Sequence, residues 1–263
     1  LMRAVIFASS SSGNCLAVSH GGTHILIDAG ISMRRIVASA AQAGLTMGNI
    51  GGVLITHEHS DHVSGLKTLL KNYPVELYAP HTVANRIMGM LPDAMGRTHI
   101  IPVGERFTIG ELSLTAFHTS HDTDESVGYR IDADGESFAV ATDTGRVTDE
   151  MLSELTGVDA VLIEANHDVQ RLLDGPYPPY LKRRILADTG HLSNADCAAL
   201  ARTLVERGTR QVILGHLSRT NNTPQLALDT VASVLDGLGA ELLCAPELGY
   251  MEIEVGECCL CSR

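Results

Sequence analysis

Residues 55–66 read ITHEHSDHVSGL, and this stretch places three histidines and two acidic side chains between positions 57 and 62. It directly follows an apolar run, Val53 to Ile55, that is typical of a buried strand. Such a stretch is either a polar loop or a set of metal ligands. The second interpretation arises because imidazole and carboxylate groups are the usual ligands of zinc-like ions. The density of these groups favours a metal site, with the candidate ligands His57, His59, Asp61 and His62.

Further candidate ligands stand where other apolar runs end. The segments ILIDAG, AVATDTG, VLIEANHD and VILGH contribute, in that order, Asp28, Asp143, Glu164 and His216. The segment LTAFHTSHD contributes either His118 or His121. Loops at one edge of a rigid sheet commonly carry the catalytic groups of layered α/β folds. We therefore expect these side chains to converge on the histidine-rich stretch.

The composition limits the class of protein. A chain of 263 residues can bury one substantial core. No apolar run is long enough to span a bilayer, so we expect no membrane association and a cytoplasmic location. The formal net charge of −12 argues against broad electrostatic capture of duplex nucleic acid. It is compatible with a nuclease, because acidic residues can be metal ligands, and the sequence carries no signal for an oligomeric state.

Short β-type runs alternate with helical patterns along the whole chain. We expect an α/β protein with one domain, residues 1–263, that contains two mixed sheets and outer helices. Residues 256–263 are expected to fray. In that tail Cys258 and Cys261 have a C-x-x-C spacing around Cys259, but no second pair is present to complete a zinc site. Thr223 followed by Pro224 is typical of a helix start.

On these residues the chain resembles the metallo-β-lactamase fold superfamily, whose signature is H-x-H-x-D-H after a buried strand. The resemblance runs from Asp28 to His216 and implies an αββα four-layer sandwich. It also implies two divalent metal ions, zinc or manganese, with iron also compatible. One ion would be held by the later histidine together with His57 and His59, and the second by Asp61, His62 and His216. Asp143 would bridge the two ions, and Asp28 would orient the motif from beneath.

Two histidines compete for the place of the later ligand. His118 is in phase with Leu112, Leu114 and Ala116, which predicts that it points with the core face of its strand. His121 lies just past that strand, in the segment SHD, and matches the related nucleases better. We expect His121 to be the ligand and His118 to be a polar residue near the end of the sheet.

The segment TGHLSN, residues 189–194, resembles the G-H-x-S segment of ribonuclease J and other β-CASP nucleases. That likeness implies that His191 contacts the scissile phosphate or protonates the leaving group, with Ser193 and Asn194 as phosphate ligands. Glu164 would polarise His191, and His167 would lie behind the site. Ser193 with Asp196 also fits a helix capping box, so capping alone explains Ser193 equally well.

Several segments together resemble the compact YycJ/WalJ-like subfamily, which lacks the inserted β-CASP domain. They are SSGNC, THEHSDH, SHD, TDTG, EANHD, GHLSN and a final stretch from His216 to Pro224. The resemblance implies a 5′-to-3′ exonuclease acting on DNA ends, in which a hydroxide that bridges the two metal ions attacks phosphorus and Asp61 orients it. The alternative is a hydrolase of a small cyclic phosphodiester, thioester or lactone, which the acidic composition favours.

Three segments near the expected site have two interpretations each. The backbone N–H groups of residues 11–14 could bind a terminal phosphate, although a plain hairpin turn explains the same residues. The basic segment LKRR, residues 181–184, is typical of a solvated helix face but could also meet an anionic substrate. The proline-rich loop DGPYPPY, residues 174–180, is expected to be exposed and to form a lip over the site.

Overall fold

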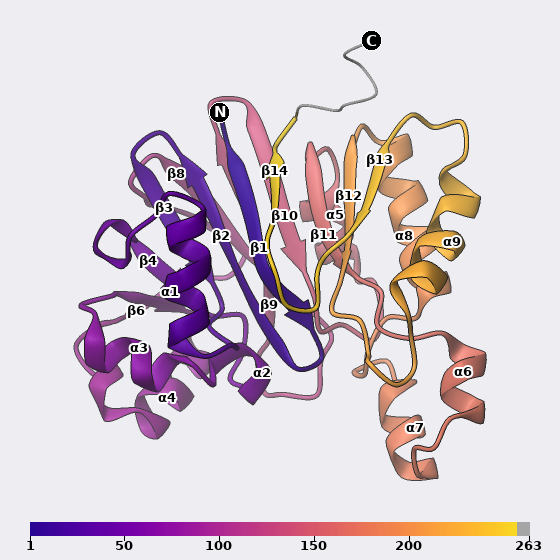
Figure 1. Ribbon diagram of the computed structural model, residues 1–263, viewed down its shortest axis with the longest axis horizontal. Coiled ribbons are helices and arrows are strands. Elements are labelled where there is room, and N and C mark those ends of the chain that lie inside the picture. The colour runs from indigo at the N-terminus through magenta and orange to yellow at the C-terminus, as the bar shows by residue number, and fades with distance from the viewer. Residues whose placement is uncertain (257–263) are drawn as a thin grey trace.

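The computed structural model describes residues 1–256 and contains two seven-stranded sheets packed face to face. Helices cover the outer face of each sheet, so the fold has four layers in the order αββα (Figure 1). This arrangement confirms the fold expected from the sequence. The tail with Cys258, Cys259 and Cys261 lies outside the described residues.

The first sheet has the strand order β14-β1-β2-β3-β4-β5-β6. Its strands are β1 (Arg3–Ser10), β2 (Gly13–His20), β3 (Thr23–Ile27), β4 (Gly52–Leu54), β5 (Leu77–Ala79), β6 (Thr98–Ile100) and β14 (Met251–Glu254). The β1–β2 pair is a hairpin, as expected, and β3 to β6 are parallel to one another. On its other side β1 pairs antiparallel with β14, in the register Arg3 to Glu254.

The second sheet has the order β13-β12-β11-β10-β9-β8-β7. Its strands are β7 (Arg106–Ile109), β8 (Leu112–His118), β9 (Val127–Ala133), β10 (Glu136–Ala141), β11 (Ala160–Glu164), β12 (Gln211–Gly215) and β13 (Glu241–Cys244). The strands β10 to β13 are parallel, and β8 runs in the same direction because it is antiparallel to β9.

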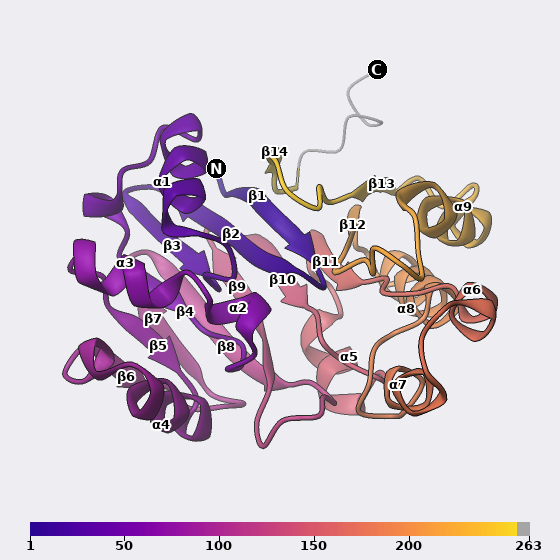
Figure 2. The same cartoon turned by 60° about the horizontal axis from the view of Figure 1, so that its bottom comes forward.

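The helices fall into three groups. Those packed on the first sheet are α1 (Met33–Gln42), α3 (Leu66–Asn72) and α4 (His81–Met90). Those packed on the second sheet are α5 (Asp149–Leu155), α8 (Asn194–Glu206) and α9 (Pro224–Leu235). Three short helices lie at the edge between the layers: α2 (Ser60–Val63), α6 (Val169–Asp174) and α7 (Pro179–Ile185) (Figure 2). Two single turns of 3-10 helix are η1 (Met47–Asn49) and η2 (Pro92–Ala94).

Both faces of the central strands are covered, which explains why they read as continuous apolar runs rather than as alternating ones. One apolar core lies between the sheets and includes Leu54, Tyr129 and Leu162, all buried. Separate cores lie between each sheet and its helices. Within residues 1–256 no helix combines the length and the apolar composition needed to cross a bilayer.

Two helix starts follow their sequence signals. The Ser193 hydroxyl caps α8 by accepting a hydrogen bond from the backbone N of Asp196 at 3.1 Å. The Thr223 hydroxyl caps α9 through the backbone N of Leu226 at 3.2 Å, with Pro224 in the first turn. Both caps are confirmed.

Candidate metal centre

The expected ligands follow strands that all run in the same direction. Asp28 follows β3, Asp143 follows β10 and His216 follows β12, so the carboxyl ends of both sheets meet at one edge. All three residues have a positive φ, of 59°, 56° and 55° respectively. Non-glycine residues rarely adopt this left-handed conformation, and strained backbone of this kind clusters at functional sites. Here it turns each side chain from its strand toward the space between the sheets.

The histidine-rich stretch leaves β4 and turns into α2. His57 and His59 lie on the loop, whereas Asp61 and His62 lie in α2 itself. The loop after β3 fixes this turn, because Ala29 N donates to the carbonyl of His62 at 2.8 Å. Gly30 is required beside it, since a Cβ at that position would overlap the Asp61 carbonyl.

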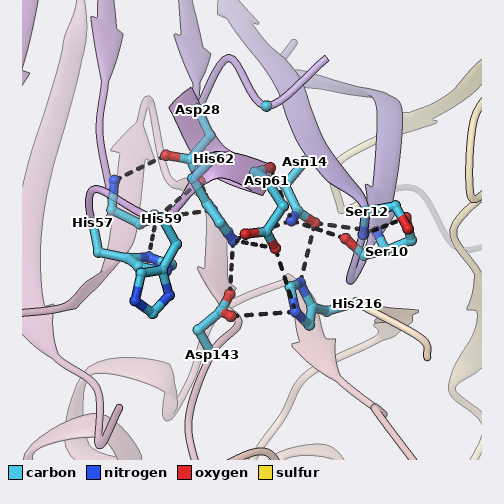
Figure 3. A network of polar contacts seen from close by, with 12 residues as sticks. Ser10, Ser12, Asn14, Asp28, His57, His59, Asp61, His62, Asp143 and His216 are labelled. Atoms are coloured by element: carbon cyan, nitrogen blue, oxygen red, sulfur yellow. Dashed lines mark hydrogen bonds and ion pairs between the residues drawn. The ribbon is translucent and has the colours of Figure 1, made fainter. Parts of the chain in front are cut away.

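Seven side chains form two adjoining groups of possible ligand atoms, and Figure 3 labels all of them except His121. Within each group all ligand atoms lie within 4.8 Å of one another. The first group contains His57, His59 and His121, and the second contains Asp61, His62, Asp143 and His216. Asp143 lies between the groups, since its Oδ2 is 3.1 Å from His62 Nε2 and its Oδ1 is 3.2 Å from His216 Nε2 and 3.6 Å from His121 Nε2.

The residues present fit divalent cations. His57 Nε2 is buried and has no hydrogen-bond partner within residues 1–256. His59 Nδ1 and His121 Nε2 face each other at 3.2 Å, an arrangement suited to two imidazoles that share a cation. Burial lowers the pKa of His57 well below its usual value, and the neighbouring His62 ring adds to this effect, so the ring is neutral and can act as a ligand.

Asp143 is held in the ionised form that a metal ligand needs. Its carboxylate is buried, and burial alone would raise its pKa. The His216 and His62 rings outweigh burial and hold the pKa of Asp143 well below its usual range. A buried carboxylate that stays charged among histidines is suited to a position between two cations.

Asp28 supports the motif instead of joining either group. Its Oδ2 is 2.7 Å from His62 Nδ1 and accepts from the Thr56 hydroxyl at 2.9 Å, while its Oδ1 accepts from Thr56 N at 2.9 Å. A carboxylate only accepts, so His62 Nδ1 carries the proton and Nε2 points to the ligand group. Thr56, which the sequence did not single out, also reaches His57 Nδ1 at 3.1 Å.

A second buried acid holds His191. Glu164 is fully buried at the end of β11, its Oε1 lies 2.7 Å from His191 Nδ1, and its Oε2 accepts from Thr144 N at 2.9 Å. Burial alone would lower the pKa of His191, but the Glu164 carboxylate outweighs it and raises the pKa to about 9. His191 is therefore an imidazolium at neutral pH in the metal-free protein.

A cavity of about 260 Å³ opens over these groups. Six of the residues expected from the sequence line it: His59, Asp61, His121, Asp143, His191 and His216. The wall also contains residues that the sequence did not assign to the site, among them Asp122, Asn166, Ser218 and Ile185. Asn166 has an evident role, since its side-chain amide donates to the His216 carbonyl at 2.9 Å and so fixes the turn after β12.

Two of the expected phosphate ligands do not reach this cavity. Asn194 is buried, and both ends of its side-chain amide pair with Asn222, at 2.8 and 3.0 Å. The prediction for Asn194 is therefore wrong, because its polar atoms are already used to join α8 to the loop before α9. Ser193 is engaged in its cap and donates to Asp196 Oδ2 at 2.6 Å. Neither residue is among those that line the cavity.

Two further histidines that the sequence singled out, His118 and His167, lie outside both ligand groups. His118 is exposed at the end of β8, and its Nδ1 lies 3.1 Å from Glu150 of α5, outside both ligand groups. This position confirms the expectation of a polar residue near the end of the sheet, and the burial shared by Leu112, Leu114 and Ala116 does not extend to His118. His167 is buried near Glu164 without lining the cavity, and neither ring nitrogen has a hydrogen-bond partner within the described residues. Burial lowers the pKa of His167.

The β1–β2 hairpin contributes a side chain rather than a phosphate-binding backbone. Ser11 N donates to the Leu217 carbonyl at 3.3 Å and Ser12 N to the Ser10 hydroxyl at 3.2 Å, so neither N–H faces a ligand. The side chain of Asn14 instead lies 3.3 Å from His216 Nδ1 and 3.1 Å from His62 Nε2 (Figure 3). No local sequence signal identifies Asn14, because it lies far along the chain from the histidine-rich motif and meets it only in the folded protein.

Comparison with known proteins agrees with this geometry. Residues 23–217 match the beta-lactamase superfamily domain. Exodeoxyribonuclease YycJ of Bacillus anthracis is 37% identical over 237 residues, which cover 89% of each chain. Exodeoxyribonuclease WalJ of Streptococcus pneumoniae is 39% identical over 236 residues, covering 88% of this chain and 87% of its own.

The solved structures show the same fold. Zinc-bound PqqB from Methylobacterium extorquens superposes with a TM-score of 0.74 at 20% identity, covering 96% of this chain and all of that one. The family expected from the sequence is thus confirmed by its sequence relatives and by its architecture. The chain belongs to the beta-lactamase superfamily, with YycJ and WalJ proteins among its relatives, and is a metal-dependent hydrolase.

Proposed function

We propose that this protein is a dinuclear metal-dependent phosphodiesterase that acts as a 5′-to-3′ exonuclease on DNA ends. The observation that carries the proposal is the meeting of two ligand groups at Asp143, with the His191–Glu164 pair in the same cavity wall. The names of the YycJ and WalJ relatives support DNA as the substrate, since both are exodeoxyribonucleases.

In this proposal one metal ion is held by His57, His59 and His121, and the other by Asp61, His62 and His216, with Asp143 shared. The ions are zinc or manganese, with iron also compatible with nitrogen and carboxylate ligands. The zinc-bound PqqB structure supports metal binding by this fold. When bound, the pair supplies an acidified water and neutralises charge on the phosphate oxygens.

The chain's own groups orient the substrate and handle protons. Asp61 faces the cavity, with its Oδ2 3.4 Å from His62 Nε2, and its carboxylate orients the attacking water. Glu164 holds His191 through Nδ1, which leaves Nε2 as the donor toward the phosphate or the leaving oxygen. The buried Glu164 charge keeps that donor protonated.

We extend the proposal to organisation and location. The chain acts as one catalytic domain, because both sheets supply ligands to a single cluster. A cytoplasmic location suits an enzyme that acts on DNA ends. Ser193 and Asn194, the predicted phosphate ligands, have no part in this proposal because neither lines the cavity.

The decisive experiment digests single-stranded DNA that carries a 5′ phosphate and a 3′ label, with manganese supplied. We expect a ladder that shortens from the 5′ end, and none with Asp61→Ala. His191→Ala protein should keep its metal content while the rate falls by about 100-fold or more. Metal loss in the His191 variant would contradict its role as a donor, and shortening from the labelled end would contradict the polarity.

A small-molecule hydrolase is the second candidate. The net charge of −12 and the limited cavity, about 260 Å³, favour a compact substrate over a long strand. Metal-loaded protein that leaves DNA intact but opens a cyclic phosphodiester, thioester or lactone would establish this alternative.

A further inference from the structure

Helix α7 and the loop before it form one wall of the cavity. Tyr177, Leu181, Arg184 and Ile185 of this segment line it. The end of the helix is fastened to the catalytic loop, since His191 N donates to the Ile185 carbonyl at 3.0 Å. Gly190 allows this close packing, because a Cβ there would overlap the same carbonyl. The inner face of α7 is therefore held in fixed relation to His191.

Arg184 is the only lysine or arginine among the described residues that line the cavity. The wall otherwise carries the carboxylates of Asp61, Asp122 and Asp143. The Arg184 side chain is 60% exposed and its Nε contacts Asp122 Oδ2. Asp122 in turn places its Oδ1 3.4 Å from His121 Nε2. The guanidinium is thus separated from the ligand group by a single carboxylate.

This separation decides which phosphate Arg184 can reach. A scissile phosphate must contact the ligand groups and His191. The Asp122 carboxylate lies between that position and the Arg184 guanidinium. A phosphate bound to Arg184 is therefore a neighbouring one along the same strand. An exposed ion pair such as Arg184–Asp122 contributes little stability, so a phosphate can replace the carboxylate at small cost. Arginine is suited to replacing a carboxylate partner with a phosphate, because its planar guanidinium group can bind phosphate with two parallel hydrogen bonds.

The same wall offers an apolar surface for a base or a sugar. Tyr177 is half-buried and Leu181 lies one helical turn before Ile185. Aromatic rings bind bases of single strands by stacking, whatever the sequence. Among the described residues no other tyrosine, phenylalanine or tryptophan lines this cavity, so the surface fits one nucleotide rather than a longer run.

We propose that the inner face of α7 is a subsite for the nucleotide next to the scissile bond, where Arg184 leaves Asp122 to bind the flanking phosphate and Tyr177 stacks on the base. This inference rests on the proposed function and adds to it a requirement for a second phosphate. Single-stranded ends with at least one such phosphate are the substrate class that follows.

The test compares Arg184→Gln with Arg183→Gln in the metal-loaded protein. Arg183 is exposed on the same helix and does not line the cavity, so the two variants change net charge equally. For each protein kcat/KM is measured on a single-stranded oligonucleotide and on bis(4-nitrophenyl) phosphate, a diester without a flanking phosphate. The readout is the ratio of the two values, which cancels any general damage to the metal centre.

We expect Arg184→Gln to lower this ratio by about 10-fold or more through KM, and Arg183→Gln to keep the wild-type ratio. The salt dependence of KM for the oligonucleotide should also weaken in Arg184→Gln by about 0.7 in log–log slope, as for one lost phosphate contact. Tyr177→Ala should lower the ratio by about 10-fold.

The subsite would be overturned if both arginine variants kept the same ratio of the two kcat/KM values. It would also be overturned if Arg184→Gln lowered kcat/KM equally on the oligonucleotide and on the bare diester. That second result would place the arginine at the scissile phosphate. Wild-type protein that hydrolyses the bare diester but not the oligonucleotide would overturn the proposed nuclease function itself, and the subsite with it. The two failures are thus distinguishable from the wild-type data alone.

Discussion

Glu164→Gln changes one charge behind His191 and leaves the shape of the side chain almost unaltered. The glutamine can still accept the hydrogen bond that Glu164 Oε2 receives from Thr144 N at 2.9 Å. It can no longer stabilise the imidazolium, whose Nδ1 is 2.7 Å from Glu164 Oε1. In the metal-free protein we therefore expect the pKa of His191 to fall from about 9, because burial lowers it and the largest charge that opposes burial has been removed.

The size of the effect follows from this pKa. A histidine whose pKa is raised on folding contributes stability that is complete below its unfolded pKa and is lost as pH rises through its folded pKa. For His191 the window runs from pH 6.5 to about 9. At about 1.4 kcal/mol per pKa unit, the contribution near neutral pH is about 3 kcal/mol. The stability difference between wild type and Glu164→Gln should shrink as pH rises through this window.

Two measurements check this prediction on protein stripped of metal by a chelator. The first is an NMR titration of the His191 ring in wild type and in Glu164→Gln. The second is the free energy of unfolding from denaturant titrations at several pH values between 6 and 10. Glu150→Gln is the matched control, since Glu150 faces His118 at 3.1 Å but is 44% exposed, and its loss should cost under about 1 kcal/mol.

A wild-type His191 that titrates below pH 7 in the metal-free protein would refute the reasoning. Equal losses of unfolding free energy in Glu164→Gln and Glu150→Gln would also refute it. In that case the burial of the Glu164 carboxylate would not strengthen its interaction with His191.

Three other substitutions, with one control, test the ligand groups and the loops that hold them. Asp61→Ala should reduce metal affinity by about 100-fold or more and lower the reaction rate with it. Elemental analysis of the dialysed protein measures the metal that remains bound. Asp28→Asn should weaken metal binding by about 10- to 100-fold in a competition titration, because an amide has one acceptor oxygen and cannot accept from both His62 Nδ1 and Thr56 N. Unchanged affinity would contradict this support. Gly30→Ala should cost about 3 kcal/mol of unfolding free energy, since the new Cβ overlaps backbone, whereas Gly89→Ala in open space on α4 should gain about 1 kcal/mol.

The ligand positions could be predicted from sequence because the signal is local. An apolar run marks a strand, the polar residue after it marks the strand's end, and strands of one direction end at one edge. Asp143 and His216 follow this rule directly. The choice of His121 over His118 follows from its position past the strand end, where the chain is free to turn toward the cluster.

Other features depend on contacts between distant segments, which local patterns do not reveal. Asn194 has the composition of a phosphate ligand, but Asn222 from another loop occupies its amide. Arg184 belongs to a basic run in which only one member faces the cavity, and which one depends on how α7 docks on the loop after Gly190. These outcomes are set by tertiary packing rather than by propensity.

The pairing of β1 with β14 has a consequence for how the molecule is made. Until the strand at residues 251–254 leaves the ribosome, β1 forms an open edge of the first sheet. Such long-range pairings close slowly and leave strand edges open in the nascent chain. His57 and His59 emerge early, but Asp143 and His216 join them only when the second sheet has docked. The complete set of ligand side chains is therefore present only after both sheets have formed.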